Sequence, residues 1–129
     1  MGGKTVVRTE EAPAPFQGAP YSQAIKAGGF VFVSGQLGLA PGASEMVGAT
    51  IQEQTEQILD NLAAILAEAG SGLDRIVKTT VFLVSLDDFQ GMNEVYARHV
   101  GDRPPARATV EISALPSGAL VEIEAVALV

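Results

Sequence analysis

The stretch PPARATVEISALPSGALVEIEA, residues 104–125, decides the expected fold because it reads as two short strands joined by a loop. Side chains alternate along both strands, which puts Arg107 and Thr109 on one face of the first and Glu122 and Glu124 on one face of the second. A guanidinium and several carboxylates therefore project from a largely apolar hairpin. Charged groups are costly to bury unless they are paired or bind a ligand, so these groups either face water or form a site.

The rest of the chain supplies four further strands. Short strands are expected at residues 4–8, 24–26 and 30–33, with Gly28 and Gly29 as a tight turn between the second and the third. The apolar, β-branched run at 75–84 is too hydrophobic to have one face in water, which is typical of a buried strand.

Two helices are expected between these strands. Thr50 followed three residues later by Glu53 is a capping-box pattern, and apolar residues then repeat at helical spacing until Gly70. A second helix is expected to start near Ser85, with Asp88 at the capping-box position, and to end before Gly101. Its expected buried residues are Phe89, Met92, Val95 and Tyr96.

This order of elements predicts a single α+β domain over residues 1–129, with a six-stranded mixed sheet and two helices on one face. Two helices cover only one face of such a sheet, yet the strands at 30–33 and 76–84 have the apolar character of strands buried on both sides. We therefore expect a second copy of the chain to cover the other face, which predicts a homo-oligomer.

Composition excludes several functions. The net charge of −7, with only eight Lys and Arg, argues against a nucleic-acid surface or an anionic-membrane surface. The absence of cysteine excludes disulfides, thiolate nucleophiles and cysteine metal sites. His99, the one histidine, is expected at an exposed position near a helix C-terminus, so no metal site and no histidine triad are expected. With no secretory signal and no long apolar segment, we expect a soluble, cytoplasmic protein.

Six separated motifs resemble the RidA/YjgF family of enamine and imine deaminases, in register over essentially the whole chain. They are GAPYSQAI at 18–25, VSGQ at 33–36, VKTTVFL at 77–83, NEVY at 93–96, PPAR at 104–107 and LPSGALVEIEAVA at 115–127. The resemblance implies a chorismate-mutase-like fold and a homotrimer, with the sheets forming an inner barrel and ligand clefts between subunits. It also implies hydrolysis of 2-imino or 2-aminoenoate acids to 2-oxo acids and ammonia, without a metal or an organic cofactor.

The same resemblance assigns roles to residues. Arg107 falls on the family's carboxylate-binding Arg, and a planar fork of donors suits a carboxylate. Glu122 falls on the Glu thought to orient or activate water. Placed on adjacent strands, Arg107 and Glu122 are expected to hold the acid end of the substrate near a water. Tyr21, Ser34 and Asn93 match further cleft positions, and Thr109 stands where relatives carry Cys, Ser or Thr.

Other interpretations of these residues remain open from the sequence. Arg107 would instead form a structural ion pair with Glu111 or Glu122, and Glu124 would be an edge-strand charge that deters aggregation. Two other functions compete with the deaminase: a non-catalytic trimer that binds small carboxylates or acts like a chaperone, and an endoribonuclease, which the acidic composition disfavours. Ala19 departs from the Gly common in relatives, so the loop that presents Tyr21, and with it the substrate preference, is expected to differ.

Overall fold

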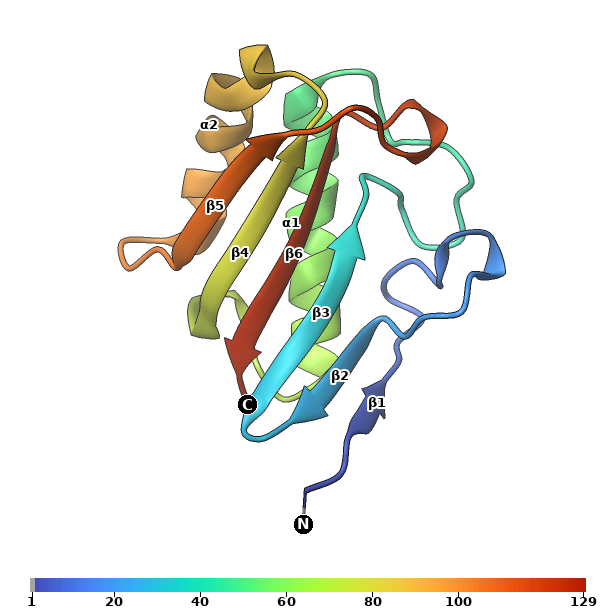
Figure 1. The fold of residues 1–129 in the computed structure, drawn as a ribbon, viewed down its shortest axis with the longest axis vertical. Helices are drawn as coiled ribbons and strands as arrows, with labels where there is room; N and C mark the ends of the chain where they lie inside the picture. The colour runs from blue at the N-terminus through green and yellow to red at the C-terminus, as the bar shows by residue number, and fades with distance from the viewer. Residues whose placement is uncertain (1) are drawn as a thin grey trace.

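The computed structural model describes residues 2–129, in which six strands form one mixed sheet (Figure 1). The strands are β1 Thr5–Val7, β2 Ala24–Ala27, β3 Phe30–Gln36, β4 Ile76–Leu83, β5 Ala106–Glu111 and β6 Val121–Leu128. Their order in the sheet is β1-β2-β3-β6-β4-β5. Only β4 and β5 pair in parallel, and the other neighbours are antiparallel. The expected α+β class and mixed sheet are confirmed.

The expected hairpin of residues 104–125 is wrong, because β5 and β6 are not neighbours. β4 lies between them and pairs with β5 on one side and with β6 on the other. The segment joining β5 to β6, which includes a 3₁₀ turn at Pro116–Gly118, carries the chain across the end of β4 (Figure 1). Alternation identifies each strand but not its neighbour. β6 takes a central position because Val121, Ile123 and Ala127 are completely buried there.

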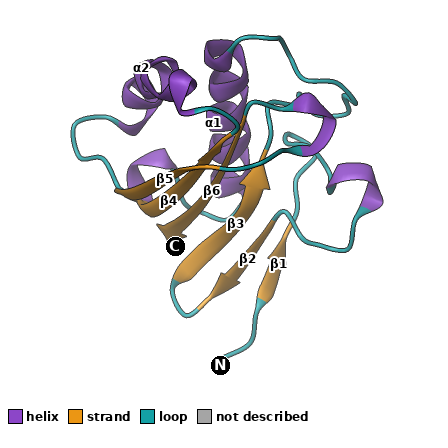
Figure 2. Ribbon diagram, turned by 45° about the horizontal axis from the view of Figure 1, so that its top comes forward, coloured by secondary structure: helices purple, strands orange, loops and turns teal. Residues whose placement is uncertain are grey.

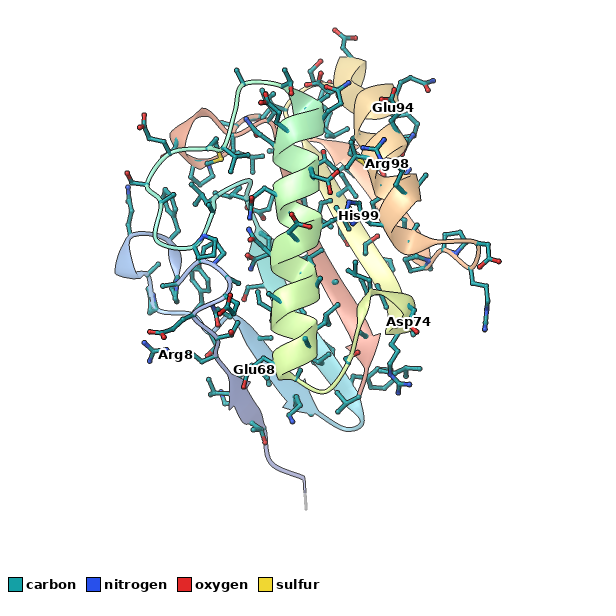
Figure 3. The ribbon with its side chains drawn as sticks, turned by 180° about the vertical axis from the view of Figure 1, so that it is seen from behind. Arg8, Glu68, Asp74, Glu94, Arg98 and His99 are labelled. Carbon is teal, nitrogen blue, oxygen red and sulfur yellow. The ribbon has the colours of Figure 1, made fainter. Side chains whose placement is uncertain are left out.

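Helix α1, Ile51–Glu68, crosses the sheet as predicted and has the predicted cap (Figure 3). The Thr50 hydroxyl accepts the backbone N–H of Glu53 at 3.1 Å, and the Glu53 carboxylate accepts the backbone N–H of Thr50 at 3.3 Å. These two bonds satisfy backbone donors that the first turn of a helix leaves without partners. The residues of α1 that are completely or almost completely buried against the sheet are Ile58, Leu59, Leu62, Ile65 and Leu66.

Helix α2, Phe89–Val100, begins later than predicted. A 3₁₀ turn, Leu86–Asp88, precedes it because the Ser85 side chain accepts the backbone N–H of Asp87, at 3.1 Å. Asp88 makes no side-chain cap, so the predicted capping box is wrong. Met92, Val95 and Tyr96 are buried as predicted, whereas Phe89 is 36% exposed. Phe89 lies beside Arg107 of the edge strand β5, where the sheet offers no further strand to cover it.

Both helices lie on one side of the sheet (Figure 2), and no other element of residues 2–129 covers the opposite side. We call this opposite side the open face. The pairings Phe30↔Leu128 and Val6↔Ile25↔Phe32 place their members on this face together. The exposed large apolar residues of the open face are Val6, Phe30, Phe32, Val110 and Leu128. In the single chain, therefore, β3 is buried on one side only, and Phe32 is 46% exposed.

Neither helix in residues 2–129 has both the length and the apolar character that crossing a bilayer requires.

Candidate functional site

A cavity of about 470 Å³ opens where β3 and β6 meet the loop before β2. Tyr21, Ser34 and Glu122 all line it, and we call these three residues the Glu122 cluster. The pairing register of β3 and β6 shifts between Val33 and Gln36, which marks a bulge in β3. Bulges re-aim side chains and are common beside active sites. The sequence motifs VSGQ and VEIE therefore meet at one place in the sheet.

Glu122 lies over the backbone of β3 at Gly35. A Cβ at Gly35 would collide with the Glu122 carboxylate, so the glycine makes room for this side chain. Burial raises the pKa of Glu122 above its ordinary value of 4.5, and the nearby Glu124 carboxylate raises it further. Both effects disfavour the ionised form. A carboxylate with a raised pKa is a better proton acceptor near neutral pH than an ordinary one.

Tyr21 and Ser34 are held at the cavity by backbone contacts. The Tyr21 hydroxyl accepts the backbone N–H of Phe16 at 2.6 Å, and the Ser34 hydroxyl donates to the carbonyl of Ser22 at 2.6 Å. Ala19 has the extended backbone, φ −62° and ψ 153°, that a residue before proline favours. Ala19 itself lines the cavity, so this departure from the family motif lies within reach of a ligand.

A second group of predicted residues lies between β5 and α2. Arg107 and Thr109 belong to this group, and Asn93 is assigned to it only from its place on α2; we call the three residues the Arg107 cluster. Arg107 pairs with Thr79 in the parallel ladder, and buried Thr79 faces the helices, so Arg107 projects toward the helix side of the sheet. Asn93 lies four residues after Phe89 on α2 and therefore shares its side of the helix.

The guanidinium of Arg107 has aromatic neighbours instead of an acidic partner. Its Cζ lies 4.9 Å from the ring centroid of Tyr96 and 5.6 Å from that of Phe89. Within residues 2–129, no carboxylate forms an ion pair with Arg107. Glu111 instead accepts the backbone N–H of Leu86 at 2.8 Å. The interpretation of Arg107 as one half of a structural ion pair is therefore wrong for the single chain.

Thr109 contributes a second unused polar group to the Arg107 cluster. Its hydroxyl oxygen is buried and has no hydrogen-bond partner in the part of the chain that the structure describes. Thr109 lies two residues after Arg107 on the same face of β5. Buried polar atoms are nearly always satisfied, so an unsatisfied hydroxyl beside an unpaired guanidinium is typical of a ligand site.

The two clusters do not meet within one chain, so the expectation that Arg107 and Glu122 lie on adjacent strands is wrong. Glu122 is opposite Phe82 on β4, whereas Arg107 is opposite Thr79. The two residues lie on strands that are two positions apart in the sheet, and their partners on β4 are three residues apart. Their Cα atoms are therefore separated by about 14 Å. Neighbouring residues of a strand face opposite sides, so Arg107 projects toward the helices and Glu122 toward the open face. One small ligand cannot reach both within a single chain.

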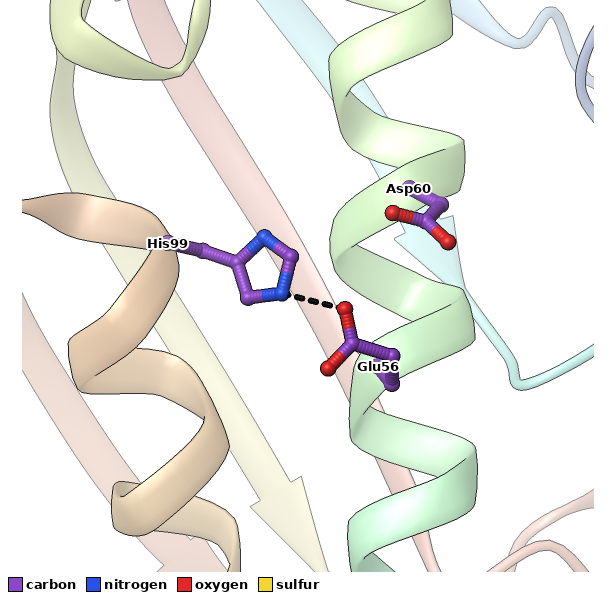
Figure 4. Close-up of side chains that lie close together, drawn as sticks. All are labelled: Glu56, Asp60 and His99. Carbon is purple, nitrogen blue, oxygen red and sulfur yellow. Dashed lines mark hydrogen bonds and ion pairs between the residues drawn. The ribbon is translucent and has the colours of Figure 1, made fainter.

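His99 is not at the exposed position that the sequence suggested. Its side chain is only 18% exposed, and its Nε2 lies 2.5 Å from Oε2 of Glu56 on α1 (Figure 4). Asp60, one turn further along α1, brings a third possible metal ligand, with all three ligand atoms within 4.8 Å of one another. The sequence reasoning missed this grouping because 43 residues separate Glu56 from His99. Glu56 also pairs with Arg98 at 3.5 Å, so existing contacts between α1 and α2 already explain its position.

Comparison with known proteins gives one consistent result. The sequence pattern described as Endoribonuclease L-PSP matches residues 9–129. A RutC family protein of Pyrococcus abyssi is 50% identical over 124 residues, which is 96% of each chain. Reactive Intermediate Deaminase A, chloroplastic, of Arabidopsis thaliana is 47% identical over 96% of this chain and 65% of its own length.

A solved structure shares the fold as well. The structure of E. coli TdcF with bound serine has a TM-score of 0.88 and 36% identity, and the match covers 97% of this chain and 98% of that one. The family pattern matches nearly the whole chain, and the Pyrococcus relative has a similar length. Both results agree with the family that the sequence motifs indicated. The chain therefore belongs to the RidA/YjgF family, whose pattern carries the description Endoribonuclease L-PSP.

Proposed function

We propose that this protein hydrolyses reactive 2-imino and 2-aminoenoate acids, such as 2-iminobutanoate and 2-iminopropanoate, to 2-oxo acids and ammonia. The observation that carries the proposal is the unpaired Arg107 guanidinium beside the unsatisfied Thr109 hydroxyl. A guanidinium with free donors suits a carboxylate bidentately. The name of the Arabidopsis relative supports this reaction class, and serine, named as bound to TdcF, is a small acid of similar size.

The proposed active site is completed between copies of the chain in a homotrimer. The Arg107 cluster lies at the edge strand β5 and the Glu122 cluster at the open face, so neither alone has both a carboxylate-binding group and a proton acceptor. A neighbouring copy packed on the apolar open face would place its own edge strand near the Glu122 cavity. The uncovered Phe30 and Phe32 side chains support this packing.

In the proposed mechanism, Arg107 binds the substrate carboxylate, and Tyr21, Ser34, Asn93 and Thr109 contact the remaining polar groups. The Glu122 carboxylate takes a proton from a water as the water oxygen forms a bond to C2 of the imine. The electron pair of the C=N bond moves to nitrogen, which takes the proton back from Glu122. Glu122 then takes the hydroxyl proton of the resulting amino alcohol and passes it to the nitrogen as the C–N bond breaks, which releases ammonia and the 2-oxo acid. Orientation of the water accounts for much of the expected rate gain.

The test couples the purified protein to a threonine dehydratase and follows the decay of the released 2-iminobutanoate. Wild type should accelerate the decay, and Arg107→Ala and Glu122→Gln should each abolish the acceleration. Arg103→Ala, which removes an exposed cation outside both clusters, is the matched control and should keep full activity. Folded wild type that fails to accelerate imine decay with both threonine and serine as precursors would refute the proposal.

The same variants separate catalysis from simple binding. Both a deaminase and a trimer that only binds small carboxylates need Arg107, so its loss does not distinguish them. Glu122 distinguishes them, because the proposed hydrolysis needs its carboxylate as a proton acceptor in the cavity, whereas binding of the substrate carboxylate by Arg107 does not. Glu122→Gln should therefore lose turnover while it retains affinity for 2-oxobutanoate.

A further inference from the structure

Two aromatic rings hold the guanidinium of Arg107, and one of them is itself anchored. The Tyr96 hydroxyl and the Thr79 hydroxyl share a hydrogen bond of 2.7 Å, and both residues are almost completely buried. Thr79 lies on β4 directly opposite Arg107 on β5. The Tyr96 ring is thereby tied to the strand beside the one that carries the arginine. A fixed ring 4.9 Å from Cζ restricts where the guanidinium can lie.

Unlike a salt bridge, this aromatic environment leaves the N–H donors of the Arg107 guanidinium free to bind a ligand. A guanidinium has five N–H donors, all in its own plane. A carboxylate partner within the chain would occupy two of these donors, whereas an aromatic face attracts the positive charge and accepts none of the in-plane bonds. Contact with two rings also removes water from the cation, which strengthens its attraction for an anion. The donors thus remain available while the position of the group is restricted.

We propose that Tyr96 and Phe89 are positioning residues that orient the Arg107 guanidinium for a carboxylate ligand, and that the Thr79 hydroxyl anchors the Tyr96 ring. This inference rests on the proposed carboxylate-binding role of Arg107. The same role accounts for the partial exposure of Phe89: this side chain is 36% exposed at the start of α2 because it packs against the Arg107 guanidinium and not into the core. Neither ring contacts the reacting atoms in this assignment.

The test measures the affinity for 2-oxobutanoate by calorimetry, and by competition in the imine-decay assay. Tyr96→Leu removes the aromatic face but keeps an apolar side chain, and it should weaken binding about 2- to 30-fold, the range expected from one cation–π contact. Tyr96→Phe keeps the aromatic face but loses the hydrogen bond to Thr79, so its affinity should lie between those of wild type and Tyr96→Leu, and wild-type affinity would show that the Thr79 anchor is not needed. Phe89→Leu, at the partly exposed ring, tests the same contact without altering the core, and should also raise KM more than it lowers kcat.

A double-mutant cycle distinguishes positioning from general loss of structure. In an Arg107→Ala background, Tyr96→Leu and Phe89→Leu should cause no further loss of affinity, because their effect acts through the guanidinium. Additive losses in that background, or wild-type affinity in both ring variants, would overturn the inference while leaving the proposed function intact. Wild type that neither binds 2-oxobutanoate nor accelerates imine decay would overturn both.

Discussion

Phe32→Glu is the change that tests most directly whether the open face joins copies of the chain. Phe32 lies in the middle of β3 and is 46% exposed. If an aromatic side chain has about 200 Å² of surface, roughly 90 Å² of Phe32 is exposed in the single chain. Burying this area in an assembly would contribute about 2 kcal/mol of association free energy per subunit, at ~25 cal/mol per Å². A carboxylate buried there without a partner would cost several kcal/mol more. We therefore expect Phe32→Glu to abolish assembly.

The single chain should tolerate this change, because the side chain projects from the open face and not into the core. Sedimentation velocity should show an oligomer for wild type and a monomer for Phe32→Glu, with similar far-UV circular dichroism and with imine deamination lost in the monomer. Ala67→Glu adds the same charge on an exposed position of α1, on the helix side of the sheet, and should stay oligomeric and active. Wild type that sediments as a monomer, or a Phe32→Glu protein with the mass of wild type, would refute the reasoning.

Three further changes test local parts of the structure. A base acts only when it is deprotonated, so activity should be lost as pH falls through the raised pKa of Glu122, at a pH above 4.5. Glu124→Gln removes the repelling charge and should move this loss of activity to lower pH. A pH–rate profile that the variant leaves unchanged would contradict this prediction. Gly35→Ala should displace the Glu122 carboxylate and lower kcat about 10- to 100-fold with little change in affinity for 2-oxobutanoate, whereas unchanged kcat would show that Glu122 keeps its place by other contacts. Thr50→Ala should lower the free energy of unfolding by about 1 kcal/mol and the Tm by about 3–5 °C in calorimetry, while Thr50→Ser keeps the capping oxygen and should match wild type.

Short-range patterns predicted much of the secondary structure. The capping box at Thr50 and Glu53 needs only residues three apart, and it formed as expected. The strands at 24–27, 30–36 and 76–83 followed from alternating or continuous apolar runs. The start of α2 was missed because Ser85 caps a 3₁₀ turn instead of the helix itself, and both arrangements use the same serine.

The candidate site also combines residues that local sequence motifs named with contacts that only the tertiary structure creates. Sequence motifs named Tyr21, Ser34, Asn93, Arg107, Thr109 and Glu122. In the structure, Tyr21, Ser34 and Glu122 line one cavity, whereas Arg107 and Thr109 share a face of β5 and Asn93 lies on α2. The aromatic neighbours of Arg107 were not recognised from the sequence, although Phe89 and Tyr96 belong to a helix whose apolar spacing was visible. That spacing predicts burial of a ring but not which side chain of another strand the ring contacts.

The sequence by itself determined the number and kind of the main helices and strands, the cap of α1 and the family, and it named the polar residues proposed for the site. The tertiary structure alone decided that β4 separates β5 from β6, that Arg107 and Glu122 face opposite sides of the sheet, and that Glu56 meets His99. Helical periodicity and strand alternation depend on residues a few positions apart. The neighbour of a strand instead depends on how the whole chain buries its apolar surface, and no local pattern of residues contains that information.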